Sequence, residues 1–488
     1  MYFPTVSISV ADFKFSRKSQ VNTLASCLYV TVGDDKVEID PKVLYQRLLV
    51  AGIGTVKPEE LLQYELCSYP TSLFDTNLKM RAADKATLQH ELVKKVEHSV
   101  IRVQPVGVTF VVIDGGALLQ RIPWPKCSTY AAICQLYAQY IERNFSTGDV
   151  IVVFDGYASG PSTKDETHRR RTGGGMGVDV EVAADMVLRM QKKLFLANQK
   201  NKQKFINLLG STLEATGIQV KHSEADADYN IAMTACSAAQ VTPVTVIADD
   251  TDVLVLLIHH MDEASNNIVM RTSTRMIDIG CMKTGLKDVI SQNVLFLHAL
   301  TGSDTTSKPF RIGKASGLAK AEALEMAASV FLEEGQPQGN IDAAGSVALA
   351  VLYGCPDLNS GRVSKFTEKV LSTSNYVPPE RLPPTDEAAR FHSRRVYHQV
   401  QAWKGNELDP EEWGWKKDEA TGQLRPKRME QAAAPASLLK IIRCNCTGRC
   451  DRNTCSCRKN MLKCTLACGK CKGITCANVE MVDSPDIE

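Results

Sequence analysis

Seven acidic residues lie along the middle of the chain, several of them at the ends of apolar runs, and their types suit the binding of cations. They are Asp114, Asp155, Glu224, Asp226, Asp250, Asp252 and Asp304. Such runs are typical of buried strands, and acids at the carboxyl ends of neighbouring strands meet in one crevice. Converging carboxylates repel one another unless cations join them, and Mg²⁺ or Mn²⁺ suits an all-oxygen ligand set. The pattern predicts two divalent cations in an arrangement that cleaves phosphodiester bonds.

Each of these acids taken singly has a plainer alternative role, as a helix cap or a turn residue. We favour the metal site for the whole set because a cluster of like charges is costly without cations. Asp228 and Asp249 are close neighbours of the set in the sequence. We do not expect either of them to ligate a metal.

A second group of potential metal ligands lies near the C-terminus, where nine of the sixteen cysteines fall in one short segment. They are Cys444, Cys446, Cys450, Cys455, Cys457, Cys464, Cys468, Cys471 and Cys476. Nine thiolates satisfy about three tetrahedral zinc ions if some of the thiolates bridge two metals. The segment has few large apolar residues, so metal binding must supply the free energy of its folding.

The Cys-rich segment is also basic, with nine Lys or Arg residues against one Asp between Lys440 and Cys476. A small basic module of this kind is suited to contacts with nucleic-acid phosphates. The candidates for those contacts are Arg449, Arg452, Arg458, Lys459 and Lys463.

Strand and helix patterns alternate through the acidic region, and this order positions the acids. Strands are predicted at 109–114, 149–155 and 242–250, helices at 128–145 and 181–217, and a strand that turns helical at 218–240. Such alternation predicts an α/β fold with a mostly parallel central sheet flanked by helices.

The remaining segments complete the predicted organisation. We expect a helical N-terminal region of unknown role (1–105), the α/β domain (106–335), a mostly helical extension (336–420), a linker (421–439) and the zinc-stabilised module (440–480). In the extension, Trp403, Trp413 and Trp415 are expected to anchor a small core rather than stack on bases.

Composition excludes some classes of protein. The formal net charge is +2, so any nucleic-acid affinity must come from local basic patches. No apolar run free of charge is long enough to span a bilayer, and the first residues lack the layout of a signal peptide. We therefore expect an intracellular protein with reduced thiols, located in the nucleus and without a membrane partner.

The acidic region resembles the flap endonuclease branch of the PIN-like nuclease superfamily. The matching pieces are ID at Asp114, FDG at Asp155, SEADA from Ser223, DDTD from Asp249 and GSD at Asp304. The resemblance implies a metal-dependent phosphodiesterase acting on branched or single-stranded nucleic acid. One cation would be held mainly by the acids from Asp114 to Asp226, and the other by Asp250, Asp252 and Asp304.

The same resemblance implies roles for basic residues. Lys164 and Arg171, on a helix after FDG, would contact the scissile phosphate, with Arg169 or Arg170 replacing Arg171 if the helix register differs. The segment after Asp304 resembles a helix–hairpin–helix element, which would present Gly313, Lys314 and Gly317 to a duplex phosphate. An ordinary joint between two helices is the alternative for that segment.

The Cys-rich segment resembles a tesmin-type CXC domain, a DNA-binding zinc module, although Thr454 stands where that family often has Tyr. The whole arrangement also resembles animal proteins with a nuclease-like centre and a Cys-rich tail, some of them derived from mobile elements. About 105 residues precede the nuclease-like region, whereas flap endonucleases begin almost directly with it.

Three functions fit these features. The first is a magnesium- or manganese-dependent nuclease, selective for DNA structure or for single strands, that is brought to DNA by the zinc module. The second is a catalytically inactive protein that binds DNA or chromatin. The third is a PIN-type ribonuclease, because only the zinc module favours DNA over RNA. The intact set of acids favours catalysis over the second function.

Overall fold

The computed structural model describes residues 29–32, 35–52, 55–102, 109–145, 148–156, 162–165, 167, 177–223, 226–372, 377–447, 449–474 and 476–479. The chain forms two compact units. The larger unit spans residues 70–430, and the smaller unit joins residues 1–69 to residues 431–488. The domain boundaries expected from the sequence stay predictions.

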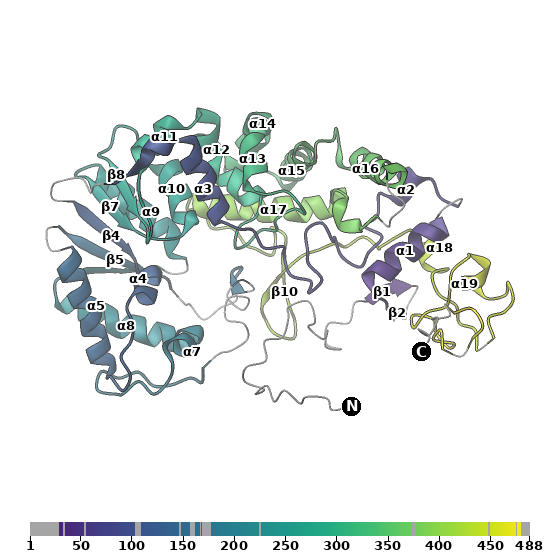
Figure 1. Ribbon diagram of the computed structural model, residues 1–488, viewed down its shortest axis with the longest axis horizontal. Helices are drawn as coiled ribbons and strands as arrows, with labels where there is room; N and C mark the ends of the chain where they lie inside the picture. The colour runs from purple at the N-terminus through teal and green to yellow at the C-terminus, as the bar shows by residue number, and fades with distance from the viewer. Residues whose placement is uncertain are drawn as a thin grey trace, which may run out of the picture. The chain divides into compact units, whose positions relative to one another are not determined.

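A seven-stranded sheet in the order β3-β9-β8-β7-β4-β5-β6 forms the centre of the larger unit (Figure 1). Its strands are β3 (Val100–Ile101), β4 (Phe110–Asp114), β5 (Val150–Phe154), β6 (Gln219–His222), β7 (Val244–Ile247), β8 (Ile268–Arg271) and β9 (Met276–Asp278). The five strands from β8 to β6 are parallel, and β9 pairs antiparallel with β8 and β3. The mostly parallel sheet predicted from the sequence is confirmed.

Apolar clusters cover both faces of the sheet because successive residues of a strand point to opposite sides. Val112 of β4 joins the cluster formed with α9 (Ala227–Ala239), α10 (Thr251–His260) and α12 (Asp288–Leu300). Val111 and Ile113 join the other cluster, with α5 (Tyr130–Asn144) and α8 (Gln199–Ala215). Figure 1 shows α5 and α8 on the opposite side of the sheet from α9 and α10. Burial on both faces explains the continuous apolar runs of these strands.

Two predicted helices between the strands have different outcomes. Helix α5 begins as expected after Thr129, whose side chain accepts a hydrogen bond from the amide of Ala132 at 3.2 Å. The helix predicted over 181–217 is wrong in its first third, where the backbone of Met186 and Leu188 instead bonds with that of Tyr130 and Ser128. Helices α7 (Lys192–Ala197) and α8 occupy the rest, and Asn198 separates them by capping α8.

Residues from the predicted N-terminal region contribute to the larger unit. Helix α3 (Ala86–Lys95) packs against α10, α11 (Ile279–Gly285) and α13 (Lys314–Ala319). Its Leu88 and Leu92 lie in the same apolar cluster as α9 and α10. Strand β3 extends the sheet at the edge next to β9. Helix α3 therefore reaches the side of the sheet on which α10 lies.

Helix α14 (Ala321–Leu332) lies within the range of the predicted α/β domain, 106–335. The range 336–420, where we expect a mostly helical extension, contains α15 (Gln338–Tyr353), α16 (Leu358–Ser372) and α17 (Asp386–Trp403). Trp403 and Trp415 are buried in the core, as expected. Strand β11 (Leu424–Pro426) pairs with β10 (Trp415–Lys417), so this part of the predicted linker is in fact half of a hairpin.

The range 338–371, which covers α15 and most of α16, is long and apolar enough, by length and composition alone, to cross a membrane. Gly354 has a left-handed φ of +69° after α15, which separates α15 from α16. Helix α15 packs closely against α17 and α14. Such contacts are typical of a helix in the core of a folded domain. A core helix of this kind can be as long and as apolar as one that crosses a membrane.

The smaller unit brings the two ends of the chain together. Its elements are β1 (Tyr29–Val32), β2 (Asp35–Glu38), α1 (Pro41–Gly52), α2 (Pro58–Leu61), α18 (Ala436–Leu439) and α19 (Ser456–Lys459). Strands β1 and β2 form an antiparallel hairpin, and α1 packs against α18. The Cys-rich segment thus shares a folded unit with the residues from 29 to 69.

Candidate functional sites: a carboxylate pocket and a cysteine cluster

Asp114 stands where strand β4 turns directly into helix α4 (Gly115–Arg121). Its side chain accepts hydrogen bonds from the amides of Gly116 at 2.8 Å and Ala117 at 3.2 Å, which caps the helix. The turn is tight, because a Cβ added at Gly115 would lie only 2.2 Å from the ring of Phe154. Glycine at this position lets β4, α4 and the end of β5 close around the carboxylate.

Asp155 follows strand β5 and lies beside Asp114. It accepts a hydrogen bond from the amide of Ala227 at 3.1 Å, at the start of α9. A Cβ placed on Gly116 would lie 3.1 Å from Asp114 Oδ1 and 3.7 Å from Asp155 Oδ2, so both carboxylates border one small space. Burial, together with the charge of Asp155, raises the pKa of Asp114 to about 7.

Three further carboxylates meet where α9 and α10 begin. One oxygen from each of Asp228, Asp250 and Asp252 lies within 4.8 Å of the others, a spacing that could hold a metal ion. Asp250 caps α10 by accepting from the amide of Asp252 at 3.0 Å. Burial, then the negative charges of Asp226 and other carboxylates, raises the pKa of Asp228 well above its usual range. The negative charge of Asp250 also raises the pKa of Asp114.

Three lysines are interleaved with the acids. Lys85, just before α3, has its ammonium 2.6 Å from Asp252, 2.8 Å from Asp304 and 3.5 Å from Asp250. Lys164 lies 2.5 Å from Asp226 and 3.5 Å from Asp228. Lys202 on α8 lies 3.7 Å from Asp155. Each lysine therefore pairs with one or more acids that are distant from it in the sequence.

A buried chain of polar groups lies behind Asp252. His298 Nε2 is 2.7 Å from Asp252 Oδ1, and its Nδ1 is 2.6 Å from the Lys314 ammonium nitrogen. Burial lowers the pKa of His298 to about 4, so the ring is neutral, and it stacks on Trp403 with centroids 5.3 Å apart. Burial alone would raise the pKa of Asp252, but Lys85 and His298 outweigh it and hold that pKa well below its usual range.

The position of Lys314 corrects the role expected from the sequence. Its side chain is buried and its nitrogen bonds to the carbonyl oxygens of His298 and Gly302. The amine therefore supports the interior of the site and is not offered to a phosphate at the surface. Gly317 also serves packing, because an added Cβ would lie 2.8 Å from the side chain of Thr301. Gly313 precedes α13, a helix of only six residues.

The donor set of the pocket suits a divalent cation. Seven carboxylates face three lysines, which leaves an excess of negative charge when all are ionised. The raised pKa values of Asp114 and Asp228 have this excess as a cause alongside burial. A cation bound to carboxylate oxygens would relieve the repulsion, and hard ions such as Mg²⁺ prefer these ligands.

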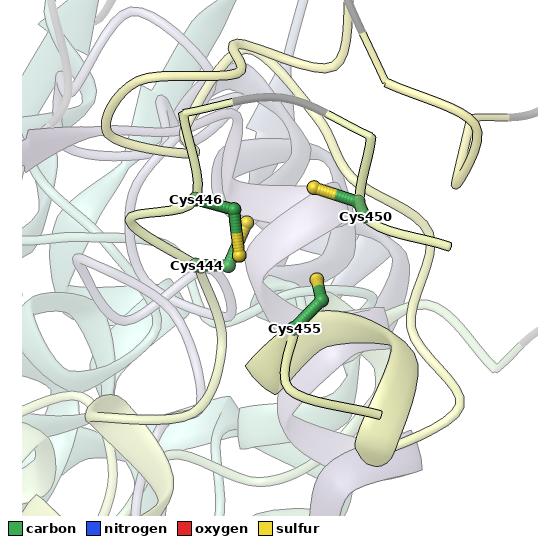
Figure 2. A group of neighbouring side chains, drawn as sticks. All are labelled: Cys444, Cys446, Cys450 and Cys455. Carbon is green, nitrogen blue, oxygen red and sulfur yellow. The ribbon is translucent and has the colours of Figure 1, made fainter. Parts of the chain in front are cut away.

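The cysteines of the C-terminal segment converge in the smaller unit. Figure 2 shows Cys444, Cys446, Cys450 and Cys455, whose sulfur atoms lie within 4.8 Å of one another. Two further groups of four cysteines meet the same spacing, and Cys444 belongs to all three groups. Cys468, in none of the groups, has its sulfur 3.6 Å from that of Cys457. A cysteine that belongs to more than one group could bridge two metal ions. Groups made up only of cysteines can bind zinc.

Arg47 of helix α1 reaches into this cysteine cluster. Its guanidinium donates hydrogen bonds to the carbonyl oxygens of Ile442, at 2.7 Å, and Lys463. A third donor lies 3.2 Å from the sulfur of Cys457. The arginine is only 5% exposed. It lies 395 residues before Ile442 in the sequence, so only the fold brings it to the cysteines. Helix α1 thus places a positive charge against the thiols.

The structure brings together six of the seven predicted acids, and Glu224 lies outside the described residues, as do Arg171 and its alternatives Arg169 and Arg170. Asp249 points away from the pocket, toward Arg121 at 3.2 Å and the amide of Ser273. Asp228 is a correction, since it lies within the carboxylate group although we did not expect it to ligate a metal.

Several residues of the pocket carry no signal in the sequence. Lys85, Lys202 and His298 stand in ordinary helical patterns, and only the fold brings them to the acids. Asp228 has a weak signal, because it follows Asp226 at the start of a helix, within reach of the same strand end.

Searches for similar proteins give distant structural matches to nucleases. The catalytic core of Rad2 in complex with DNA substrate is 15% identical, with a TM-score of 0.35, over 65% of this chain and 85% of that chain. T5 D15 protein co-crystallised with metal ions is 15% identical, with a TM-score of 0.29, over 61% and 98%. The Holliday junction-resolving enzyme GEN1 in complex with product DNA and Mg²⁺ is 13% identical, with a TM-score of 0.25, over 50% and 48%.

No protein-family model matches the sequence, and no curated protein matches it.

Proposed function

We propose that this chain is a divalent-metal-dependent nuclease that hydrolyses phosphodiester bonds in DNA. The supporting observation is the convergence of carboxylates from the ends of β4 and β5 and the starts of α9 and α10, interleaved with lysines. A pocket used only for structure has no need of an excess of buried acids, because buried charge is costly unless it is paired.

Asp228 and Asp250, whose oxygens lie within 4.8 Å of each other, would hold a cation, and we propose that Asp114 joins them while Asp252 is engaged by Lys85 and His298. When bound, Mg²⁺ or Mn²⁺ polarises a phosphate oxygen and lowers the pKa of a water molecule beside it. His298 fixes the orientation of Asp252 through its Nε2–H group. Lys164 neutralises Asp226 and lies at the partly exposed side of the pocket, where it can donate to a substrate phosphate and offset its charge.

The cysteine cluster would bring the nuclease to DNA in the nucleus. We propose that its nine cysteines hold about three zinc ions, with some thiolates bridging. Arg449, Arg452, Arg458, Lys459 and Lys463 are all exposed, as contacts with phosphates require.

A cleavage assay tests the proposal. The full chain is incubated with Mg²⁺ or Mn²⁺ and labelled flap DNA, single-stranded DNA, duplex DNA or RNA. The wild type should cut DNA, and the double variant Asp250→Asn, Asp252→Asn should not. Asp249→Asn is the matched control, since Asp249 pairs with Arg121 outside the pocket, and it should cut normally.

Each other outcome has a distinct meaning. Cleavage of RNA alone would support the ribonuclease alternative. Binding of DNA with no metal-dependent cutting would support the inactive DNA-binding protein. Equal residual cutting by the wild type and the double variant would come from a contaminant and would contradict the proposal.

A further inference from the structure

The ammonium group of Lys85 occupies the middle of one half of the carboxylate pocket. It lies 2.6 Å from Asp252, 2.8 Å from Asp304 and 3.5 Å from Asp250. The Lys85 side chain is 14% exposed. These three acids are the set that the sequence assigns to a second divalent cation.

Both oxygens of Asp252 are already engaged by protein groups. Oδ2 accepts from Lys85, and Oδ1 lies 2.7 Å from His298 Nε2. The side chain is 1% exposed, so while Lys85 is in place a hydrated cation has no approach to it from solvent. In this arrangement Asp252 serves as the partner of Lys85 and His298, and the position between Asp252 and Asp304 is filled by an ammonium group.

The packing of helix α3 positions the backbone of Lys85. Lys85 directly precedes α3, whose Leu88 and Leu92 are buried in the main apolar cluster. Its ammonium group lies within 3.5 Å of three carboxylates and so places a positive charge among them.

We propose that Lys85 supplies one of the two positive centres of the pocket, so that the site takes one divalent cation instead of two. This inference rests on the proposed function and specifies its cation requirement. The remaining place lies at Asp228 and Asp250, one oxygen of each of which lies within 4.8 Å of the other, and we assign Asp114 to it with them. An ammonium offsets charge and donates hydrogen bonds, but it cannot activate water as a metal ion does. Water activation therefore falls to the single divalent cation.

The test counts manganese ions on the zinc-loaded full chain by electron paramagnetic resonance of free Mn²⁺, with calorimetric titration as a second count. The wild type should bind about one Mn²⁺ in the pocket, and Lys85→Met should bind about two, because the lost ammonium leaves Asp252 and Asp304 to the metal. Lys85→Gln repeats the test with a polar side chain. Lys287→Met, at an exposed lysine paired with Glu322, is the matched control and should bind about one. The double variant Asp228→Asn, Asp250→Asn gives the number of Mn²⁺ ions bound outside the pocket, and this number is subtracted from each of the other counts.

The outcomes separate this inference from the proposed function. Two ions on the wild type would overturn the role of Lys85 and leave the nuclease proposal standing. The same count on the wild type and on both folded Lys85 variants, or the loss of Mn²⁺ from those variants, would also overturn it. No manganese on the wild type would overturn both this inference and the proposed function.

Discussion

Replacing Arg47 with methionine should weaken zinc binding by the cysteine cluster, although Arg47 lies far from the cysteines in the sequence. The guanidinium bonds to the carbonyl oxygens of Ile442 and Lys463 and to the sulfur of Cys457. Methionine keeps much of the side-chain volume and removes all three donors. Two carbonyl oxygens and a thiol in a buried site then lose their partner.

The size of the effect follows from the cost of unpaired acceptors. A buried acceptor that loses its partner costs about 1 kcal/mol at the lower end of the usual range, so three cost about 3 kcal/mol. Since about 1.4 kcal/mol corresponds to a factor of ten, zinc affinity should fall by about 100-fold if cluster folding and zinc binding are fully linked.

Competition with a chromogenic zinc chelator measures this change on the purified full chain. Arg449→Met is the matched control, because it removes the same charge from an exposed position of the same segment. The control should hold zinc as the wild type does. If Arg47→Met also retained zinc as the wild type does, our account of how α1 supports the cluster would be refuted.

Three further predictions concern the larger unit. His298→Leu frees Asp252 Oδ1 and should reduce Mn²⁺-dependent cleavage by more than tenfold, while zinc content is unchanged; full activity would contradict the positioning role. Because burial and Asp155 raise the pKa of Asp114 to about 7, the metal-free native state holds an extra proton between the ordinary Asp pKa and about 7. Its thermal stability should therefore fall as pH rises from 5 to 8 by more in the wild type than in Asp114→Asn, and equal slopes would count against this charge distribution. Gly115→Ala forces a Cβ against Phe154 and should destabilise the protein by about 1–3 kcal/mol in urea unfolding. Gly339→Ala, in a helix with open space around it, should cost nothing, and equal effects of the two would sink the packing argument.

The sheet could be predicted because its signals are local. Val111, Val112 and Ile113 form an apolar run that ends in an acid, and this run is β4. The first part of the helix predicted over 181–217 is wrong because residues 184–188 bond to the backbone of residues 128–131 at the start of α5, a long-range partner that no local pattern reveals. Helix propensity there is overridden by tertiary contacts.

The pocket could be predicted only in part for the same reason. The acids that follow parallel strands lie close together because the carboxyl ends of those strands meet at one edge of the sheet. Lys85 reaches Asp252 from 167 residues away, and His298 reaches it from within an apolar helix, so nothing beside either residue indicates the contact. Lys314 shows the opposite error, in which a Gly-rich turn looked like a phosphate site but its lysine folds inward.

Anomalous X-ray diffraction from manganese-soaked crystals of the full chain tests the central claim most directly. We predict an anomalous peak at manganese coordination distance from the carboxylates of Asp114, Asp228 and Asp250, with Lys85 still bonded to Asp252. Manganese bound away from these acids, or carboxylates spread over separate surfaces, would contradict the account.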